Sequence, residues 1–189
     1  MSVQSADYMY LGKKKCKLID VEGKKQIIDC GDFPVPDESW YLNITTACMR
    51  GYTAVYYIVR KTLYGIKKQE VYNLQNIDEG KVIKSSKIMI PFTGSCIVAY
   101  GGKGWNSDFI SSYLDYEEAF ELYFEEGLLV EKLSLDSAIQ KAKIMFESEK
   151  YRTGMEPHER AQWRERTARK PLKYKYFRST YKWRKQNTT

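Results

Sequence analysis

Residues 45–59, TTACMRGYTAVYYIV, form the most strand-like stretch of the chain. β-Branched and aromatic side chains dominate it, and such side chains fit the pleated surface of a sheet. Because both faces of the stretch are apolar, we expect a central strand with a neighbour on each side. The stretch also contains Arg50 and Gly51, and a glycine inside a strand often marks a bulge or a close backbone approach.

Shorter strand signals lie on both sides of this stretch. Residues 8–11, 15–20 and 25–30 are predicted strands, separated by the turn dipeptides Gly12-Lys13 and Glu22-Gly23. Downstream, Leu63, Ile66 and Val71 continue the sheet, and residues 88–90 and 95–100 add two segments. Short strands joined by tight turns predict an antiparallel meander or a partly closed sheet.

Residues 119–125 alternate apolar and polar side chains, with Phe120, Leu122 and Phe124 on one face. Glu126-Gly127 then offers a turn into residues 128–133, so we favour a β-hairpin. A short helix over residues 116–124 is the rival interpretation, because Glu117, Glu118 and Ala119 tolerate one.

Two helices are predicted after this hairpin. Apolar residues recur at three- and four-residue spacing from Leu135 to Phe146, which indicates an amphipathic helix capped by Ser134 or Asp136 and stopped by Gly154. A second, polar helix runs from Pro157 to about Ala168, supported by the pairs Glu156 with Arg160 and Glu165 with Arg169 and ended by Pro171. Its one large apolar side chain, Trp163, is too little to hold it tightly to a core.

The 189 residues thus predict a β-rich α+β protein with one packed amphipathic helix and a basic, helical C-terminal tail. We place the globular domain at residues 1–150 and the tail at 151–189. No apolar run approaches the roughly 20 residues of a membrane helix, and the first ten residues lack the features of a secretory signal. We therefore expect a soluble cytoplasmic protein that makes no membrane contact.

The charge is concentrated in the tail. Residues 151–189 contain 12 basic and three acidic residues, so they carry +9, whereas residues 1–150 carry −2. No acidic residue follows Glu165, and five aromatic residues lie among the last 16. Purely solvating tails are poor in aromatic residues. The pattern therefore predicts an anionic macromolecular partner.

We predict that the binding residues of the tail are its cations and rings. They are Arg164, Arg166, Arg169, Lys170, Lys173, Tyr174, Lys175, Tyr176, Phe177, Arg178, Tyr181, Lys182, Trp183, Arg184 and Lys185. The leading hypothesis is a non-enzymatic interaction protein whose tail docks on an acidic protein surface or a nucleoprotein assembly. Direct binding of nucleic acid is the second hypothesis. The oligomeric state stays open.

A third hypothesis is a small enzyme or nucleotide sensor. Its pocket would be built around Arg50 and the glycine-rich loop at residues 101–104. The possible pocket residues are Arg50, Tyr52, Lys103 in the loop and Trp105 directly after it. Glycine loops can cradle phosphate, but this one lacks the spacing of a nucleotide-binding motif. The alternatives to a ligand pocket are purely structural: a strand bulge at Arg50 and an ordinary turn at the glycine-rich loop.

The sequence offers little for metal or nucleophilic chemistry. Four scattered cysteines, Cys16, Cys30, Cys48 and Cys96, accompany the single histidine His158, without a C-x-x-C pair. We expect no metal site, no cofactor and no catalytic residue, and we expect the cysteines to behave as small apolar side chains on strands.

Residues 7–133 resemble a group of uncharacterised bacterial proteins. The matching positions are Asp7-Tyr8, Gly12-Lys13, Ala47-Cys48, Arg50-Gly51-Tyr52, Leu63-Tyr64, Thr93-Gly94, Tyr116-Glu117, Phe124-Glu125, Gly127 and Val130. Met49 stands where that group is expected to have tryptophan, and the basic tail is an addition. The resemblance implies a common β-rich fold and carries over no activity.

Overall fold

The computed structural model describes residues 7–21, 27, 41–42, 53–73, 76–84, 87–102 and 112–173. The strands are β1 (Tyr8–Leu11), β2 (Lys14–Val21), β3 (Tyr41–Leu42), β4 (Thr53–Val59), β5 (Thr62–Asn73), β6 (Asn76–Lys84), β7 (Ile88–Met89), β8 (Gly94–Tyr100), β9 (Glu118–Glu125) and β10 (Leu128–Ser134). The helices are the 3₁₀ turn η2 (Tyr113–Asp115) and α1 (Asp136–Glu147), α2 (Glu149–Arg152) and α3 (Pro157–Arg169). The predicted β-rich α+β class is confirmed.

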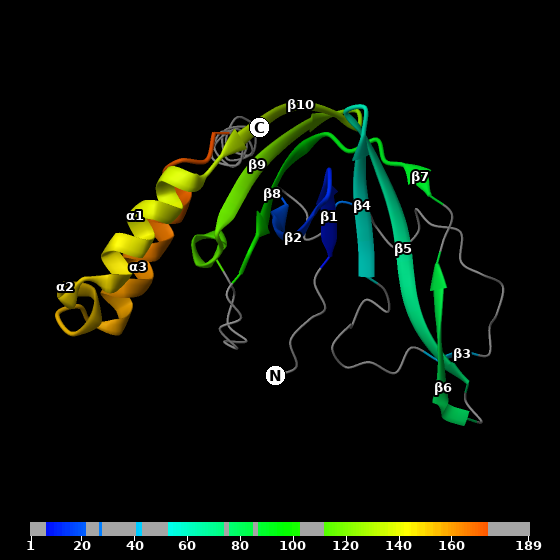
Figure 1. Cartoon of the computed structure of the whole chain (residues 1–189), viewed down its shortest axis with the longest axis horizontal. Helices are drawn as coiled ribbons and strands as arrows, with labels where there is room; N and C mark the ends of the chain where they lie inside the picture. Colours follow the sequence, from blue (N-terminus) through cyan, green and yellow to red (C-terminus); the bar gives the residue numbers. More distant parts are fainter. Residues whose placement is uncertain are drawn as a thin grey trace, which may run out of the picture.

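Seven strands form a closed barrel in the order β10-β9-β8-β2-β1-β4-β5. The closing contact pairs Leu128 of β10 with Thr62 of β5, and hydrogen bonds from Leu63 N–H to Gly127 O (2.8 Å) and from Leu129 N–H to Lys61 O (2.7 Å) flank it. β3, β6 and β7 add to the long strand β5 outside this path. Figure 1 shows β5 extending from the barrel toward β3 and β6.

The barrel is mixed rather than a purely antiparallel meander, which corrects the prediction. β1 lies between β2 and β4, antiparallel to β2 but parallel to β4. At the start of this parallel pair, the buried side chain of Asp7 accepts a hydrogen bond from the Ala54 N–H at 2.9 Å, which joins the two strand ends. Local turn signals cannot reveal such a long-range pairing.

Several predicted elements are confirmed. β1, β2, the second half of the 45–59 stretch, β5, β7 and β8 lie where expected, and residues 118–134 form the hairpin rather than a helix. Glu126 and Gly127 make its turn with φ values of 46° and 80°. The predicted strand at 25–30, the turn at Glu22-Gly23 and residues 45–52 lie outside the described residues, apart from Ile27.

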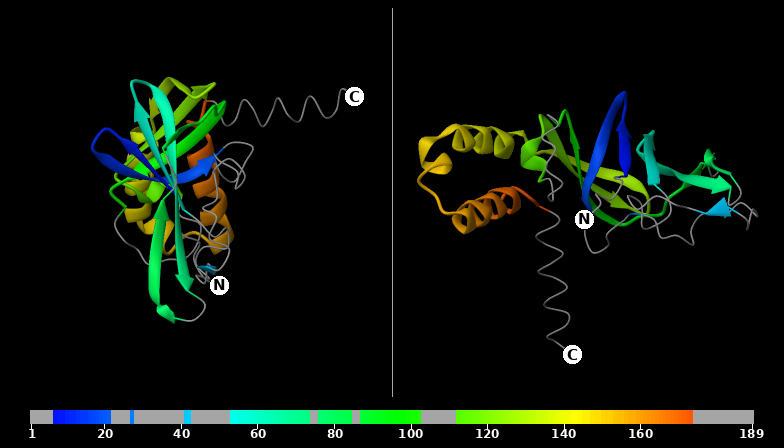
Figure 2. Two further views of the ribbon diagram at one scale, coloured as in Figure 1. Left: turned by 90° about the vertical axis from the view of Figure 1, so that its right-hand side faces the viewer. Right: turned by 90° about the horizontal axis from the view of Figure 1, so that it is seen from below.

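The barrel interior is one apolar core, and the helices cover a second. Cys96 and Val98 of β8 face the barrel, where they join Met9, Tyr56, Leu63, Leu122 and Phe124. Ile97 and Ala99, the alternate residues of the same strand, face Leu114, Ile139 and Leu172 in the second core. Figure 2 shows the helices together at one side of the barrel.

The helix α1 forms from the predicted apolar stripe. Its residues Ala138, Ile139 and Ala142 are buried against the outer side of β8 and β9. α1 ends at Glu147, before the predicted stop at Gly154, because the Ser148 hydroxyl donates to Met145 O at 2.6 Å and accepts from Tyr151 N–H at 3.2 Å. Ser148 thus ends one helix and caps the next.

The polar helix α3 spans Pro157–Arg169, as predicted, and none of its residues is fully buried. Trp163 packs against Phe146 and Tyr151 with ring centroids 5.9 Å and 5.7 Å away, and each such aromatic contact adds roughly 0.5–1.5 kcal/mol. The Tyr113 hydroxyl also donates to Ala168 O at 2.7 Å. These contacts join α3 to α1, α2 and η2, and the expectation that α3 is loosely held stays a prediction.

Within the described ranges, no helix has the length and apolar character of a membrane span. The predicted division at residue 150 falls inside α2 and stays a prediction.

Candidate functional site

Five of the fifteen predicted tail residues lie in the described part of the chain. Three of them have partners within the same chain. Arg164 binds Asp115, Arg169 pairs with Glu165 on the preceding turn at 2.5 Å as predicted, and the Lys173 ammonium lies 3.1 Å from a Glu131 carboxylate oxygen. Arg166 and Lys170 are exposed. The other ten, Tyr174, Lys175, Tyr176, Phe177, Arg178, Tyr181, Lys182, Trp183, Arg184 and Lys185, lie outside the described residues.

The four predicted pocket residues also lie outside the described residues: Arg50, Tyr52, Lys103 and Trp105. Two glycines of the predicted loop, Gly101 and Gly102, are described. A methyl group at Gly102 would meet the Tyr116 ring at 2.7 Å, and one at Gly101 would collide with the Glu117 side chain. These two glycines therefore serve a close approach between segments, which favours the turn interpretation of the loop.

Cys16 and Cys96 are buried strand residues, as predicted, and both are free thiols. Burial raises the pKa of both thiols, so neither is poised as a nucleophile. Cys30 and Cys48 lie outside the described residues. Where the structure describes side chains, no three His, Cys, Asp or Glu groups gather as a metal site would require.

The barrel presents a row of aromatic and cationic side chains on its outer side. Strand pairing sets Tyr10 directly opposite Tyr57, and Tyr57 directly opposite Tyr64, across β1, β4 and β5. The same row continues to Lys15 on β2 and to Met89 on β7. Tyr8 precedes Tyr10 by two residues and so lies on the same side of β1. We define the tyrosine face as these four residues, Tyr8, Tyr10, Tyr57 and Tyr64, together with the lysines beside their rings, Lys15 and Lys87.

The rings of the tyrosine face are ordered by one another and by lysines. Tyr10 and Tyr57 stack with centroids 5.1 Å apart and ring planes 2° from parallel. The Lys87 ammonium lies 4.6 Å from the centre of the Tyr64 ring and 5.6 Å from that of Tyr57, and Lys15 lies 4.0 Å from that of Tyr8. All four tyrosines are half-buried, which leaves part of each ring exposed to solvent.

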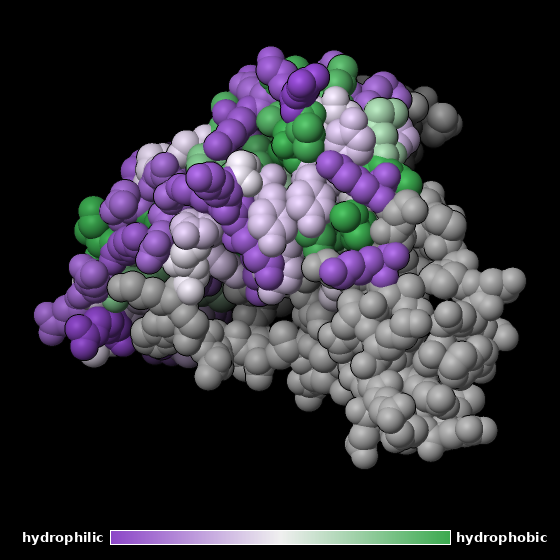
Figure 3. Space-filling model, turned by 45° about the vertical axis from the view of Figure 1, so that its right-hand side comes forward, coloured by the Kyte–Doolittle hydropathy of each residue, from purple (hydrophilic) through white to green (hydrophobic). Residues whose placement is uncertain are grey.

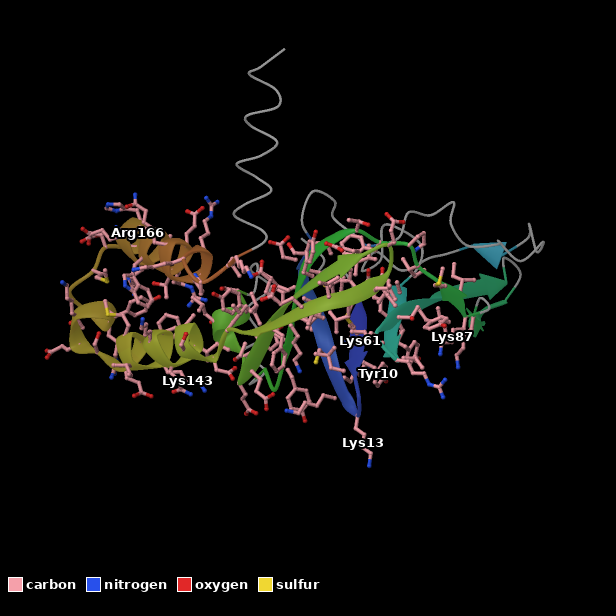
Figure 4. The ribbon with its side chains drawn as sticks, turned by 90° about the horizontal axis from the view of Figure 1, so that it is seen from above. Tyr10, Lys13, Lys61, Lys87, Lys143 and Arg166 are labelled. Carbon is pink, nitrogen blue, oxygen red and sulfur yellow. The ribbon has the colours of Figure 1, made fainter. Side chains whose placement is uncertain are left out.

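Figure 3 shows this side of the barrel as pale side chains of intermediate hydropathy bordered by purple hydrophilic ones. In Figure 4, Tyr10 and Lys13 extend from the β1–β2 hairpin on one side of the ribbon, with Lys61 and Lys87 farther along the barrel. Arg166, on α3, lies on the opposite side of that view. Exposed Met89, with 56% of its surface accessible, adds an apolar edge beside Tyr64.

Residues 1–150, whose net charge is only −2, contain two sectors of opposite charge. Residues 8–19 and 53–68, which form β1, most of β2, β4 and the first part of β5, contain eight basic and no acidic residues. Residues 112–131, which form η2, β9 and the start of β10, contain seven acidic and no basic residues. The four tyrosines of the tyrosine face and Lys15 lie within the basic sector, and Lys87 lies outside it.

This arrangement has a definite chemical capacity. Aromatic rings offer flat apolar surfaces on which other rings can stack, and surrounding ammonium groups attract phosphates. Lys14, by contrast, is committed to Glu118 at 2.5 Å, and this hydrogen bond raises its pKa. The ammonium groups beside the rings of the tyrosine face are those of Lys15 and Lys87.

Sequence reasoning did not find the tyrosine face. The Tyr8-x-Tyr10 spacing signals two rings on one side of a strand. Only the parallel pairing of β1 with β4 and the antiparallel pairing of β4 with β5 bring Tyr57 and Tyr64 into the same row. Those pairings depend on register, which the tyrosines themselves do not reveal.

No protein-family model matches the chain. No curated protein sequence matches it. No solved structure matches it either. The resemblance of residues 7–133 to uncharacterised bacterial proteins therefore stays an expectation.

Proposed function

We propose that this protein binds single-stranded nucleic acid on the tyrosine face. The observation that carries the proposal is the Tyr10–Tyr57–Tyr64 row with Lys15 and Lys87 beside its rings. Bases of a single strand can leave their own stack and lie on aromatic side chains, whereas paired bases of a duplex keep their flat sides covered. A flat row of rings on a sheet therefore suits a single strand.

The charge of the basic sector supports the same function. Eight basic residues and no acidic ones in residues 8–19 and 53–68 create an attractive field for a phosphate backbone. The tail would add phosphate contacts, as its nine basic residues beyond Glu165 carry no acidic counterpart. Recognition built on rings and phosphates tolerates many base sequences, so we expect weak sequence preference.

The test measures binding of a fluorescently labelled 12-nucleotide strand to the full chain by anisotropy, with DNA and RNA strands as separate arms. We expect binding that weakens steeply with salt. Tyr10→Leu combined with Tyr57→Leu removes two rings while it keeps apolar bulk on the strands. Since stacking contributes about 1–3 kcal/mol per base, affinity should fall at least about tenfold.

Matched controls separate binding from folding. Tyr100→Leu removes an exposed ring that also lies near a lysine, Lys14, but outside the tyrosine face. It should leave affinity unchanged. Lys87→Gln should lower the slope of log affinity against log salt by about 0.7, the value for one phosphate contact on a single strand. Lys143→Gln, an exposed lysine on α1, should not change the slope.

Two results would contradict this proposal. One is the absence of salt-dependent binding by the full chain. The other is full affinity in the Tyr10→Leu/Tyr57→Leu variant, with circular dichroism showing it folded. If affinity then vanished on removal of residues 174–189, the tail alone would be the nucleic-acid contact.

A second candidate function keeps the leading expectation from the sequence, docking of the tail on an acidic protein surface. The observation that favours it is the position of Lys173. Its backbone N–H donates to Glu121 Oε2 at 2.8 Å, and its ammonium pairs with Glu131. A carboxylate-rich sheet surface thus already holds the first residue of the cationic, aromatic segment. Isothermal calorimetry with a polyglutamate peptide would show salt-dependent heat only if the remaining tail binds carboxylates.

A further inference from the structure

The outer side of the β9–β10 hairpin is a carboxylate surface beside the start of the tail. Along β9, Leu122 and Phe124 belong to the barrel core, so Glu121, Tyr123 and Glu125 lie on the other side. Across the ladder, Glu131 is paired with Tyr123, and Leu128 with Glu125. We call the set Glu121, Tyr123, Glu125, Leu128 and Glu131 the acidic face.

The residues directly after α3 contact the acidic face. Leu172 is 8% exposed and belongs to the second core, which fixes the backbone immediately before Lys173. The Lys173 N–H then donates to Glu121, and its side chain reaches Glu131, two residue pairs closer to the hairpin turn. These two contacts place the end of the described chain over the hairpin rather than away from it.

The sequence that follows is complementary to the acidic face. Lys173 and Lys175 alternate with Tyr174 and Tyr176, followed by Phe177 and Arg178. In an extended segment, Lys173, Lys175 and Phe177 would lie on one side, and Tyr174, Tyr176 and Arg178 on the other. Glu131 already pairs with Lys173, and Glu125 adds an exposed carboxylate toward the hairpin turn. The exposed side chains of Leu128 and Val130, 52% and 55% accessible, offer apolar contacts beside it.

The lengths are compatible. At about 3.3 Å per residue, five extended residues span about 17 Å, and the four-residue distance from Glu121 to Glu125 along β9 is about 13 Å. The segment is covalently continuous with Lys173, so its effective concentration at the face is in the millimolar range or above, which favours the same chain over a second copy.

We propose that residues 174–178 bind the acidic face of their own chain, with Lys175 as the charged contact and Phe177, on the same side of an extended segment, over Leu128 and Val130. This inference does not depend on the tyrosine face. It implies that the tail cations exchange between an internal carboxylate surface and any external anion, so an external partner must compete with the hairpin.

Limited trypsin digestion of the full chain tests the proposal, because cleavage after Lys175 or Arg178 requires a segment that has left the face. Glu125→Gln combined with Glu131→Gln removes two charges from the face and leaves the buried Glu121 in place. Cleavage should become about five- to tenfold faster, as expected for loss of two partly exposed ion pairs. Glu147→Gln with Glu149→Gln, an equal charge change on exposed helix residues, should leave the rate unchanged.

A cross-linking experiment identifies the occupant. The photoreactive residue p-benzoylphenylalanine replaces Phe177 in the full chain, and mass spectrometry maps the cross-linked peptides. We expect cross-links within one chain to residues 118–134, at a yield that does not change on dilution. Cross-links only between chains would assign the face to a second copy and overturn the proposal. Equal digestion rates in both double variants, or cross-links confined to other parts of the chain, would also overturn it.

Discussion

Nη2 of Arg164 on α3 lies 2.7 Å from both carboxylate oxygens of Asp115 at the end of η2. The Arg164 guanidinium also lies 4.8 Å from the centre of the Phe146 ring on α1. One side chain therefore connects α3 to two elements that belong to the second core.

Loss of this connection should destabilise the protein measurably. We expect Asp115→Asn to lower the free energy of unfolding by about 1 kcal/mol, the range for a partly exposed, charge-assisted contact. The Glu165–Arg169 pair, whose side chains are 57% and 71% exposed, is the control, and Glu165→Gln should cost less than about 0.5 kcal/mol. Urea unfolding followed by circular dichroism measures both. A larger effect at Glu165 would contradict the assignment.

Gly127 should be intolerant of substitution because it lies at the barrel seam, the place where β10 closes the barrel against β5. Its N–H donates to Phe92 O at 2.9 Å and its carbonyl accepts from Leu63 N–H, with φ at 80°. A methyl group there would collide with Ile90 O. We expect Gly127→Ala to cost more than about 2 kcal/mol.

Gly12 provides the matched comparison for Gly127. Its φ is 61°, but a methyl group would meet no atom within 4 Å. Gly12→Ala should therefore cost only about 1 kcal/mol, from backbone strain alone. Equal losses in the two variants, measured by urea unfolding, would show that the seam contributes nothing beyond the backbone angle.

Tyr113 should make stability depend on alkaline pH. Burial, followed by the charge of Glu121, raises the pKa of its phenol above the usual value near 10. In the unfolded chain the phenol ionises near pH 10, whereas in the folded chain it stays neutral, so folding loses stability as pH rises above 10. Tyr113→Phe removes this titration and the hydrogen bond to Ala168.

Comparison of the wild type with Tyr113→Phe shows in which direction stability changes with pH. At pH 8 the wild type should be more stable than Tyr113→Phe by about 1 kcal/mol, the contribution of a hydrogen bond. This advantage should shrink between pH 10 and pH 11. Thermal unfolding at each pH measures it, and an advantage that grows with pH would contradict the burial of the phenol.

Cys96 should resist alkylation in the native protein. Its thiol is buried, and the loss of hydration, followed by the charge of Glu121, raises its pKa, so little thiolate forms near neutral pH. In a Cys30→Ser/Cys48→Ser background, iodoacetamide should modify Cys16 and Cys96 only as fast as the chain opens. Modification by mass spectrometry should accelerate by orders of magnitude in urea, and rapid labelling without urea would refute this prediction.

Local signals explain why much of the fold could be predicted. The alternation at Phe120, Leu122 and Phe124 and the turn at Glu126-Gly127 together identify the hairpin from the amino-acid sequence alone. The apolar stripe that includes Ala138 and Ile139 does the same for α1. In each case the residues that decide the structure are close in sequence.

The missed features depend on residues far apart in sequence. The parallel pairing of Met9 with Tyr56 and the closing contact between Thr62 and Leu128 have no local signature. The same holds for Trp163, whose aromatic partners Phe146 and Tyr151 lie on the preceding helices. The two charged sectors were missed for a different reason: the sum of −2 over residues 1–150 conceals them, although a count by segment shows each in the sequence.

β8 belongs to both apolar cores. Cys96 and Val98 contribute to the barrel interior, and Ile97 and Ala99 contribute to the core beneath the helices. Neither layer can melt without exposing one side of this strand to water. The barrel and its helices should therefore unfold together in one cooperative transition, and amides of β8 should be among the slowest in the chain to exchange with deuterium.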